Sequence, residues 1–507
     1  MTNDPASRPE MLPLETGNGP TSGGVAPQAT TGPGVGRRLR KGERVELVIA
    51  TLAFGGQGIG RLDNFVVFVD GAVPGDVAEV AVTRVKRSFA EARLERLLTP
   101  SPDRRDAACG HFGSCGGCRW QSLEYGVQLR YKEQQVRDSL ERLGGLGGFE
   151  LHPIKGMPDP WRYRNKVEFS IAGVDGEPTV GFHPPGRWDT VLPLSECRLV
   201  PMETEAIRST VESWLRDVGV VPWNARARTG FARHLTVREA AMTGEILVSL
   251  VTSPGELPDP GGLVRRLRAT HPGVVGILHA VNAGTAEVAS RVPHTTLWGR
   301  TYLFERLGGL RLKIGIDAFF QTNTRMAEVL YAAAADAAGL APDAGRNAGT
   351  RPVIWDLYSG IGSIALSMAS GARAVLGIEI VESAVADARE NARLNGVVTA
   401  TFLHGDARVV LKEVLEERRE LPEGLEHPDV VVLDPPRGGL AKKVVARVAT
   451  AHPARIVYVS CNPTTMAPDC AHFAELGYRL VRVTPVDMFP HTPHIEAVGL
   501  LERVDHS

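Results

Sequence analysis

Three of the six cysteines in this 507-residue chain are clustered in the segment CGHFGSCGGC, as Cys109-x5-Cys115-x2-Cys118. Six thiols are too few for a chain of this size to depend on disulfides, so the cluster indicates a metal or iron–sulfur site. Cys197, in LPLSECRLV, is a candidate fourth ligand. A four-cysteine iron–sulfur cluster is our interpretation. Zinc and unligated thiols stay open, although zinc ribbons usually contain two C-x2-C pairs and this sequence shows one.

A second kind of cysteine ends a predicted strand in RIVYVSCNPTT, where Cys461 lies. A thiol at the carboxyl end of a buried strand faces a ligand crevice, and we expect the amide-rich turn there to lower its pKa. An inert core cysteine is the alternative, but Ser-Cys-Asn-Pro predicts a sharp turn out of the strand. Further on, VDMFPHTPHIEAVGLL supplies His491, His494 and Glu496 as acid or base candidates.

The segment VIWDLYSGIGSIALSMA, residues 353–369, predicts a strand, a glycine-containing turn and a helix. Acids then follow three further predicted strands, as Glu379, Asp406 and Asp434. The carboxyl ends of parallel strands form the ligand crevice of doubly wound α/β folds. The turn reads G-I-G-S-I-A, short of the three glycines that a dinucleotide favours. S-adenosylmethionine has no pyrophosphate and carries a cationic sulfonium, so we predict a Rossmann-like class I methyltransferase domain.

The chemistry is suggested by LDPPRGG together with the later cysteine. Asp-Pro-Pro after a hydrophobic strand marks methyltransferases that act on bases, and Arg437 follows the prolines here instead of an aromatic residue or a cysteine. Carbon 5 of uracil is a poor nucleophile and needs activation. We hypothesise that Cys461 adds to carbon 6, carbon 5 attacks the methyl of S-adenosylmethionine, and Glu496 removes the carbon-5 proton. The base must be unstacked, which requires an RNA-binding surface.

The length predicts several domains, because single hydrophobic cores stop growing near roughly 250–300 residues. Residues 1–37, rich in Gly, Pro, Ser and Thr, predict a disordered leader. Short alternating strands over 38–98 predict a closed β-barrel of the OB type. A β-rich central domain with the cysteine cluster is predicted over 99–310, and the α/β domain over 311–507.

Charge and hydropathy limit the partners. Lys plus Arg (57) nearly balance Asp plus Glu (58), so a nucleic-acid surface must be a local patch. One predicted turn holds three such cations, Arg84, Lys86 and Arg87. The segment WRYRNKVEF alternates cations with aromatics on a predicted strand, which suits RNA contact or a charge-protected edge strand. Apolar runs are too short to span a bilayer, and we expect a soluble, cytoplasmic monomer.

Taken together, these motifs resemble the RNA uracil-5-methyltransferases of the TrmA/RumA type. The resemblance covers nearly all of residues 40–505, including a TRAM domain at about 38–98. Its motifs here are YRNKVEF, FFQTN, DLYSGIGSIAL, LDPPRGG, SCNP and HTPHIE. It implies that a [4Fe–4S] cluster is bound by Cys109, Cys115, Cys118 and Cys197. It implies that S-adenosylmethionine is bound by Gln321, Tyr358, Ser363, Glu379, Asp406 and Asp434. It also implies Cys461 as nucleophile and Glu496 as base.

Some positions are less well matched to the family. Ser363 stands where many members carry Asn, and Cys470 matches no family motif. Phe319 is expected to flank the cofactor or target base, with core packing as the alternative. Cluster-bearing members most often act on 23S ribosomal RNA, so we predict that substrate, with transfer RNA as the alternative. A non-catalytic RNA-binding or chaperone protein of the same fold is the remaining hypothesis.

Overall fold

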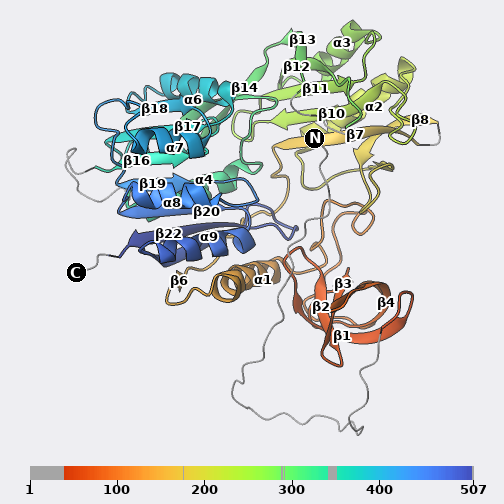
Figure 1. Cartoon of the computed structure of the whole chain (residues 1–507). Helices are drawn as coiled ribbons and strands as arrows, with labels where there is room; N and C mark the ends of the chain where they lie inside the picture. Colours follow the sequence, from red (N-terminus) through yellow and green to blue (C-terminus); the bar gives the residue numbers. More distant parts are fainter. Residues whose placement is uncertain (1–38, 175, 287–288, 290–291, 341–350, 505–507) are drawn as a thin grey trace. The chain divides into compact units, whose positions relative to one another are not determined.

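The computed structural model describes residues 39–174, 176–286, 289, 292–340 and 351–504. The predicted leader and most of the glycine-containing linker near residue 345 lie outside these residues. The chain divides into two compact units, the first ending at Arg104 and the second beginning at Arg105. Each unit is described by itself below, and Figure 1 labels their elements.

The first unit is a closed five-stranded barrel with the order β1-β2-β3-β5-β4. Its strands are β1 (Arg44–Leu52), β2 (Gly58–Leu62), β3 (Phe65–Asp70), β4 (Val77–Val85) and β5 (Phe89–Thr99). Buried and exposed residues alternate along β1, because successive side chains of a strand face opposite sides. The expected OB-type barrel is confirmed. Arg84 at the end of β4, and Lys86 and Arg87 in the turn that follows it, are all exposed.

Strand β2 has no clear signal in the sequence, because GIGRL contains two glycines and little periodicity. The structure explains Gly58. A Cβ there would lie 2.8 Å from the Ala72 carbonyl oxygen and 2.8 Å from the Ile49 side chain. Gly58 therefore allows a close backbone approach inside the barrel, which is a common reason for glycine in a strand.

The second unit contains a seven-stranded sheet with the order β13-β12-β11-β10-β7-β8-β9. Its strands are β7 (Lys166–Val174), β8 (Glu177–Phe182), β9 (Leu192–Pro193), β10 (Ala232–Glu239), β11 (Ile246–Thr252), β12 (Val274–Val281) and β13 (His294–Gly299). Helices α2 (Met202–Asp217) and α3 (Pro260–Thr270) contribute Trp214 and Leu263 to its hydrophobic core, which includes Phe169 and Leu250 of the sheet.

The same unit contains an eight-stranded sheet with the order β18-β17-β16-β19-β20-β22-β21-β6. Its strands are β6 (Glu150–Leu151), β16 (Val353–Leu357), β17 (Ala374–Glu379), β18 (Ala400–His404), β19 (Val430–Leu433), β20 (Arg455–Ser460), β21 (Tyr478–Val486) and β22 (Glu496–Arg503). Strands β16 to β20 are parallel, whereas β22 is antiparallel to both of its neighbours. This confirms the predicted Rossmann-like class I methyltransferase architecture.

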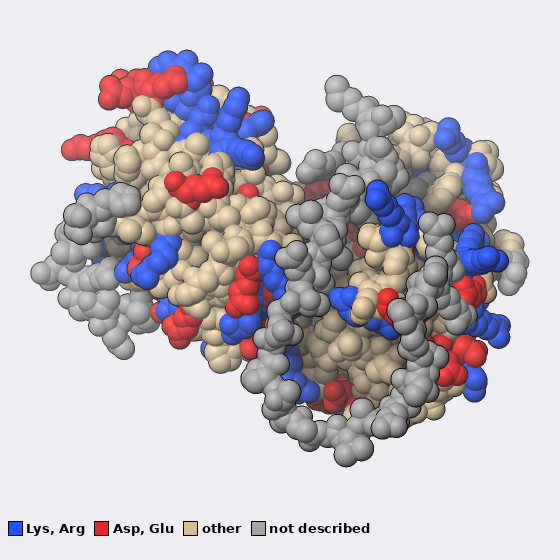
Figure 2. Space-filling model, turned by 60° about the horizontal axis from the view of Figure 1, so that its bottom comes forward, with Lys and Arg blue, Asp and Glu red and all other residues tan. Residues whose placement is uncertain are grey.

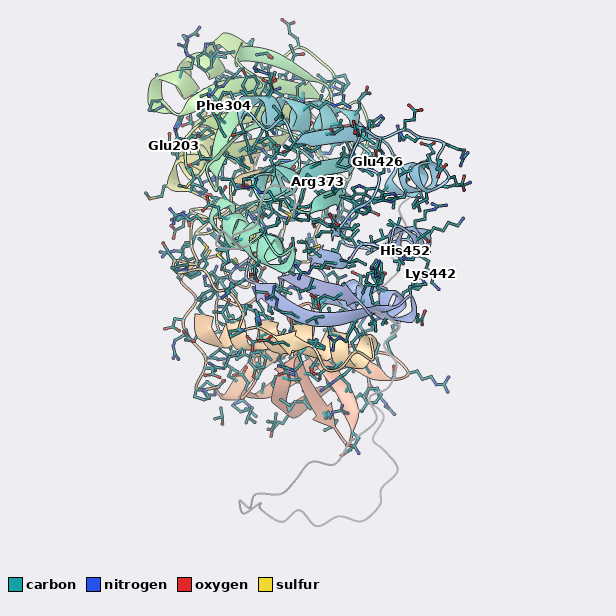
Figure 3. All side chains as sticks on the ribbon, turned by 90° about the vertical axis from the view of Figure 1, so that its left-hand side faces the viewer. Glu203, Phe304, Arg373, Glu426, Lys442 and His452 are labelled. Atoms are coloured by element: carbon teal, nitrogen blue, oxygen red, sulfur yellow. The ribbon has the colours of Figure 1, made fainter. Side chains whose placement is uncertain are left out.

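Helices alternate with the parallel strands. They are α5 (Ser363–Met368), α6 (Glu382–Leu394), α7 (Ala407–Leu415), α8 (Lys442–Thr450) and α9 (Pro463–Glu475). Charged or polar side chains are exposed near the amino ends of β17, β19 and β20. Examples are Arg373, Glu426 and His452, which are labelled in Figure 3. The opposite edge of the same strands holds the acids described below. No helix of the described residues is long and apolar enough to cross a membrane.

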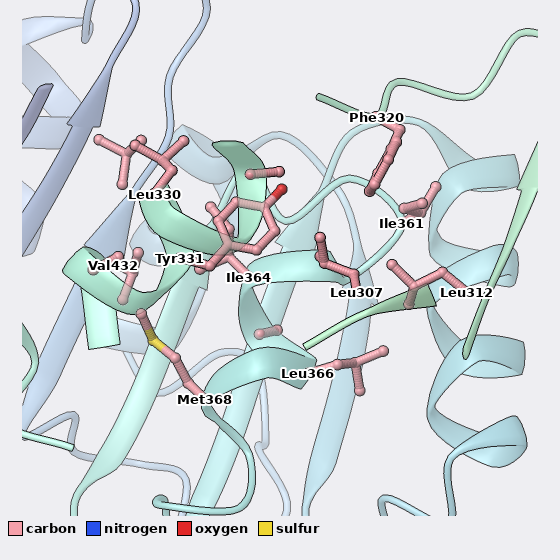
Figure 4. Close-up of a cluster of buried hydrophobic side chains, with 14 of the residues drawn as sticks. Leu307, Leu312, Phe320, Leu330, Tyr331, Ile361, Ile364, Leu366, Met368 and Val432 are labelled. Atoms are coloured by element: carbon pink, nitrogen blue, oxygen red, sulfur yellow. The ribbon is translucent and has the colours of Figure 1, made fainter. Parts of the chain in front are cut away.

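A hydrophobic core joins this sheet to the hairpin β14 (Tyr302–Leu307) and β15 (Leu310–Gly315) and to helix α4 (Thr324–Ala337). Figure 4 shows Tyr331 of α4 beside Ile364, with Phe320 near Ile361. Phe320 is 4% exposed, whereas the neighbouring Phe319 is 70% exposed. The core-packing interpretation of Phe319 is therefore wrong, because Phe320 is the residue of this pair that packs in the core.

Helix α1 (Tyr125–Asp138), followed by a π-helical turn η1 (Ser139–Leu143), contacts α9 and strand β21 of the eight-stranded sheet. The turn packs on α9, and β6 pairs in parallel with β21 at the sheet edge. On α1, Lys132 is fully buried and its Nζ lies 2.5 Å from the Asp487 carboxylate, which is also fully buried. Tyr125 donates its hydroxyl to the other oxygen of Asp487, at 2.9 Å.

We predict that Lys132→Ala lowers the free energy of unfolding by about 3–5 kcal/mol, because it leaves the Asp487 charge buried without its ion partner. The matched control is Arg137→Ala on the same helix, which removes an exposed ion pair with Glu141. That control should cost less than about 1 kcal/mol. Urea denaturation of both variants measures the two costs, and equal losses would contradict the role given to Lys132.

Candidate active site

The loop after β16 and the end of β17 are held together by Glu379. Its carboxylate accepts hydrogen bonds from the N–H groups of Gly360, at 3.0 Å, and Val381, at 2.8 Å. Tyr358 lies in the same loop with a positive φ of 69°. Burial raises the pKa of Tyr358 to about 12, with Asp406 adding to the rise. Tyr358, Glu379 and Asp406 therefore lie along one carboxyl edge, as the sequence predicts.

Two further acids lie deeper at this edge. Asp356, on β16, is fully buried, and neither carboxyl oxygen accepts a hydrogen bond of ordinary geometry. Burial raises its pKa well above the ordinary value, and the charge of Asp434 adds to the rise. Burial also raises the pKa of Asp434, at the end of β19, to about 7. Sequence reasoning missed Asp356, although it opens the DLYSGIG motif.

The other predicted cofactor residues have partners within the protein. Asp406 caps α7 and forms a bidentate ion pair with Arg408, which lowers its pKa. The Ser363 hydroxyl lies 2.9 Å from the hydroxyl of Tyr331. Gln321 is 4% exposed and lies two residues after the exposed Phe319. The side chain of Ser363 is therefore turned toward α4, which is consistent with its departure from the family pattern.

Cys461 follows β20, and two carboxyl groups lie near its thiol. Burial raises the pKa of Cys461 to about 11, Glu496 and Asp434 add to the rise, and Arg437 opposes it. The expectation of a lowered pKa is therefore wrong, because burial and two acids outweigh the turn. Glu496 opens β22 and is 2% exposed, with its Oε2 unpartnered. Burial raises its pKa well above the ordinary value, as expected, with Asp434 contributing.

The turn that carries Cys461 is tied to the Asp-Pro-Pro loop. Asn462 caps α9 through its side chain, and its Nδ2 donates to the Arg437 carbonyl at 3.2 Å. Thr465 donates its hydroxyl to the same carbonyl at 3.3 Å. The two segments that carry Asp434 and Cys461 are therefore fixed to each other by hydrogen bonds on one backbone oxygen.

The loop before β22 is fixed from three directions. Lys132 binds Asp487, Tyr163 donates its hydroxyl to the Pro490 carbonyl at 3.0 Å, and Asn323 donates to the Met488 carbonyl at 3.1 Å. These partners come from α1, from the segment before β7 and from the start of α4. The sequence gives no signal for them, because they depend on contacts between distant parts of the chain.

His491 and His494 differ in their surroundings. The Gln128 side chain accepts a hydrogen bond from the His491 backbone N–H and also hydrogen-bonds Nδ1 of the His491 ring. Trp161 stacks on the same ring, with centroids 3.8 Å apart. Burial lowers the pKa of His491 to about 4, and its Nε2 is buried without a partner. The Nδ1 of His494 instead lies 3.5 Å from Nη2 of Arg437. His491 is therefore a structural residue, not an acid or base candidate.

The segment before β7 is also used inside the protein. Residues 161–165 precede the strand instead of forming it. Arg162 donates to the carbonyls of Cys197 and Val200, and Trp161 stacks on His491. The alternation of cations and aromatics thus reflects internal contacts for Trp161 and Arg162.

The four cysteines of the predicted cluster are near enough for their charges to influence one another. Burial raises the pKa of Cys118 to about 12, and the Cys197, Cys115 and Cys109 thiols each add to the rise. The Gly117 N–H lies 3.4 Å from the Cys115 sulfur. Burial raises the pKa of Cys197, and hydrogen bonds from two backbone N–H groups, of Leu199 and Val200, oppose the rise. Backbone amides directed at thiol sulfurs are typical of iron–sulfur sites.

No three His, Cys, Asp or Glu side chains of the described residues are grouped so as to hold a metal ion. The loop that carries Cys109, Cys115 and Cys118 is nevertheless joined to the segment of Cys197. His111 Nε2 accepts a hydrogen bond from the Ser195 N–H at 2.9 Å. Cys470 lies apart in α9, fully buried.

Comparison with known proteins agrees with this geometry. Residues 310–504 match the family model described as tRNA (Uracil-5-)-methyltransferase, and residues 38–94 match the TRAM domain model. An uncharacterized RNA methyltransferase of Bacillus cereus is 36% identical over 467 residues, covering 92% of this chain and 98% of the relative. One of Porphyromonas gingivalis is 38% identical over 475 residues, covering 90% and 99%.

Among solved structures, the tRNA (uracil-54, C5)-methyltransferase of Pyrococcus abyssi, in complex with S-adenosyl-L-homocysteine, is similar with a TM-score of 0.70. It is 28% identical and covers 90% of this chain and 100% of that chain. Fold and site thus define a class I, S-adenosylmethionine-dependent RNA methyltransferase. Within that class, the chain belongs to the RNA uracil-5-methyltransferase family.

We predict that alkylation of Cys461 by iodoacetamide rises about tenfold per pH unit up to pH 10, because only the thiolate reacts and its pKa is about 11. Glu496→Gln removes a negative charge that opposes the thiolate, so the reaction at pH 8 should become faster. Glu502→Gln, at the far end of β22, is the control and should leave the profile unchanged. Mass spectrometry of the Cys461 peptide measures each rate. A plateau below pH 9 would contradict the raised pKa.

Proposed function

We propose that this enzyme methylates carbon 5 of a uridine in 23S ribosomal RNA through a covalent bond between Cys461 and carbon 6 of the base. The observation that carries the mechanism is the placement of the Cys461 thiol beside two acids, Glu496 and Asp434, at the carboxyl edge of the sheet. A nucleophile and an adjacent carboxyl group are the two parts that carbon-5 methylation of uracil needs.

In this mechanism the Cys461 sulfur bonds to carbon 6, and the electrons of the carbon 5–carbon 6 double bond move toward carbon 4. S-adenosylmethionine, when bound at the carboxyl edge, supplies the electrophilic methyl group that carbon 5 takes. Glu496 then accepts the proton from carbon 5, the double bond re-forms and the Cys461 sulfur leaves. A carboxylate with a raised pKa is the stronger base for this step, and its proton can pass to solvent afterwards.

The cofactor site is assigned to the edge that holds Tyr358, Glu379, Asp406 and Asp434, with Gln321 and Ser363 contributing from the adjoining segments. The solved archaeal relative binds S-adenosyl-L-homocysteine, which supports S-adenosylmethionine as the methyl donor. Acidic groups at this edge suit a cationic sulfonium. We assign the exposed ring of Phe319 to stacking on the target base, since aromatic faces bind unstacked bases.

RNA contact is assigned in part to the barrel. The exposed side chains of Arg84, at the end of β4, and of Lys86 and Arg87, in the turn after it, offer cations to phosphates. On the face of the molecule shown in Figure 2, Lys and Arg side chains are interspersed with Asp and Glu. Local groups of cations, more than a field of one sign, would therefore position the RNA.

A second candidate substrate is transfer RNA, because the solved archaeal relative is named for that activity. Labelled methyl transfer to 23S ribosomal RNA and to transfer RNA, with 5-methyluridine located by mass spectrometry, tests the proposal. Label in ribosomal RNA alone is the expected result. Label in transfer RNA alone would move the function to the second candidate, and no label in either would overturn both.

We predict that Cys461→Ala lowers methyl transfer by on the order of 10⁴-fold or more, as expected for loss of a nucleophile, while cofactor affinity is largely retained. Cys470→Ala is the control, because that thiol is buried in α9 away from the site, and it should retain most of the activity. Turnover by Cys461→Ala at the level of the control would remove the nucleophile assignment.

A [4Fe–4S] cluster is proposed on Cys109, Cys115, Cys118 and Cys197, whose sulfurs influence one another and receive backbone amides. When bound, the cluster would cross-link the loop of the first three cysteines to the segment of the fourth. We predict about four irons per chain in anaerobically purified protein, and loss of iron and colour in Cys197→Ser but not in Cys470→Ser. One zinc and no colour would contradict the cluster.

A further inference from the structure

His494 lies beside the reacting groups, and the proposed mechanism above gives it no role. It precedes Glu496 by two residues, and Arg437 connects it to the nucleophile. The Arg437 guanidinium lies 3.5 Å from His494 Nδ1 and is close enough to Cys461 to oppose the rise in that thiol's pKa. The imidazole of His494, the Cys461 thiol and the Glu496 carboxyl therefore surround one place at the end of β20 and the start of β22.

The contact with Arg437 fixes which nitrogen of His494 carries the proton. A guanidinium has N–H donors and no acceptor, so Nδ1 must accept. In a neutral imidazole the other nitrogen, Nε2, then carries the hydrogen. Among the described residues, Nε2 of His494 has no hydrogen-bond partner, and it is not sealed from solvent as Nε2 of His491 is. His494 therefore presents a free N–H donor.

The surroundings keep this ring neutral. Burial lowers the pKa of His494 to about 4, and four cations add to the effect. Those cations are Arg437 after β19, Lys132 on α1, Arg164 before β7, and Arg119 in the segment after the cysteine loop. A ring that stays neutral at pH 7 donates a hydrogen bond without giving up its proton. Triosephosphate isomerase uses a neutral histidine in this way toward a carbonyl.

We propose that His494 is a further catalytic residue, whose Nε2–H donates a hydrogen bond to oxygen 4 of the target uracil. The inference rests on the proposed function. When the Cys461 sulfur bonds to carbon 6, the displaced electron pair reaches oxygen 4, which becomes an enolate oxygen. A hydrogen bond aimed at that oxygen is stronger in the transition state than in the ground state. Oxygen 2 receives no such charge, so the assignment is specific to one carbonyl.

The first test separates bond formation to carbon 6 from proton removal. The RNA that the methyl-transfer assay identifies is prepared with 5-fluorouridine at the target position. Carbon 5 then holds fluorine instead of a proton, so the reaction stops after methyl transfer, with Cys461 still bonded to the base. Gel electrophoresis under denaturing conditions measures how fast this complex forms. Failure of the unmodified enzyme to form this complex would overturn the proposed covalent mechanism and also the role proposed for His494.

With the complex established, His494→Ala should slow its formation about 10²-fold, which is the usual loss when one donor to an oxyanion is removed. Glu502→Gln, at the far end of the same strand β22, is the matched control and should form the complex at the unmodified rate, because it lies away from the reacting groups. His494→Gln, whose amide can also donate, should recover part of the rate. Formation by His494→Ala at the unmodified rate would overturn the proposal.

A second test identifies the atom that His494 contacts. Methyl transfer is measured on RNA with 4-thiouridine or 2-thiouridine at the target, because sulfur accepts hydrogen bonds weakly. The intrinsic effects of sulfur on the base are the same for the unmodified enzyme and for His494→Ala. The ratio of their losses in rate therefore isolates the contact between His494 and the substituted atom. The 4-thio substitution should cost the unmodified enzyme about fivefold more than it costs His494→Ala, and the 2-thio substitution should cost both equally. Equal losses at position 4 would leave His494 a purely structural residue.

Discussion

The buried ion pair between Lys132 and Asp487 is the contact on which the geometry of the active site depends most. Both side chains are fully inaccessible to solvent, and charges in such a place are tolerated only when paired and hydrogen-bonded. Asp487 begins the loop that ends at Glu496, and Lys132 also donates to the Phe489 carbonyl. The position of the carboxyl group proposed as the base, Glu496, is therefore influenced by a helix more than 350 residues earlier in the sequence.

The acids at the carboxyl edge share one physical feature, which is that they are crowded and poorly solvated. Asp356, Asp434 and Glu496 all have raised pKa values because burial disfavours their charged forms, and the charge of Asp434 adds to the rise for Asp356 and Glu496. Ionisation of all three carboxyl groups at once is therefore unfavourable. A cationic ligand would relieve this repulsion, which is a physical reason for the edge to bind a sulfonium compound.

Much of the catalytic half could be predicted from the sequence, because its signals are local. Strands that end in Glu379, Asp406 and Asp434 are readable from hydrophobic runs, and the carboxyl-edge rule then brings those acids together. The groups that hold the site could not be predicted in this way. Lys132 and Gln128 look like ordinary polar residues of an exposed helix, and only tertiary packing makes them buried partners of residues 487–491.

The same limit explains the errors. The turn at Cys461 does expose amides, but the pKa follows from the buried acids beside it, which sequence spacing does not reveal. Trp161 and Arg162 have the composition of an RNA contact, yet their partners are His491 and the carbonyls near Cys197. Aromatic and cationic side chains serve interiors and interfaces equally well, so their types alone do not separate the two uses.

The short strand β6 has a consequence for how the catalytic domain can be divided. Residues 150–151 complete the edge of a sheet whose other seven strands all lie after residue 352. The seven-stranded sheet is thus inserted within a catalytic domain that is discontinuous in sequence. A gene segment encoding residues 310–507 would contain every strand needed for cofactor binding, yet it would leave β21 as an open edge and Asp487 without a counter-ion. Exchange of this domain between proteins therefore has to carry both pieces of chain.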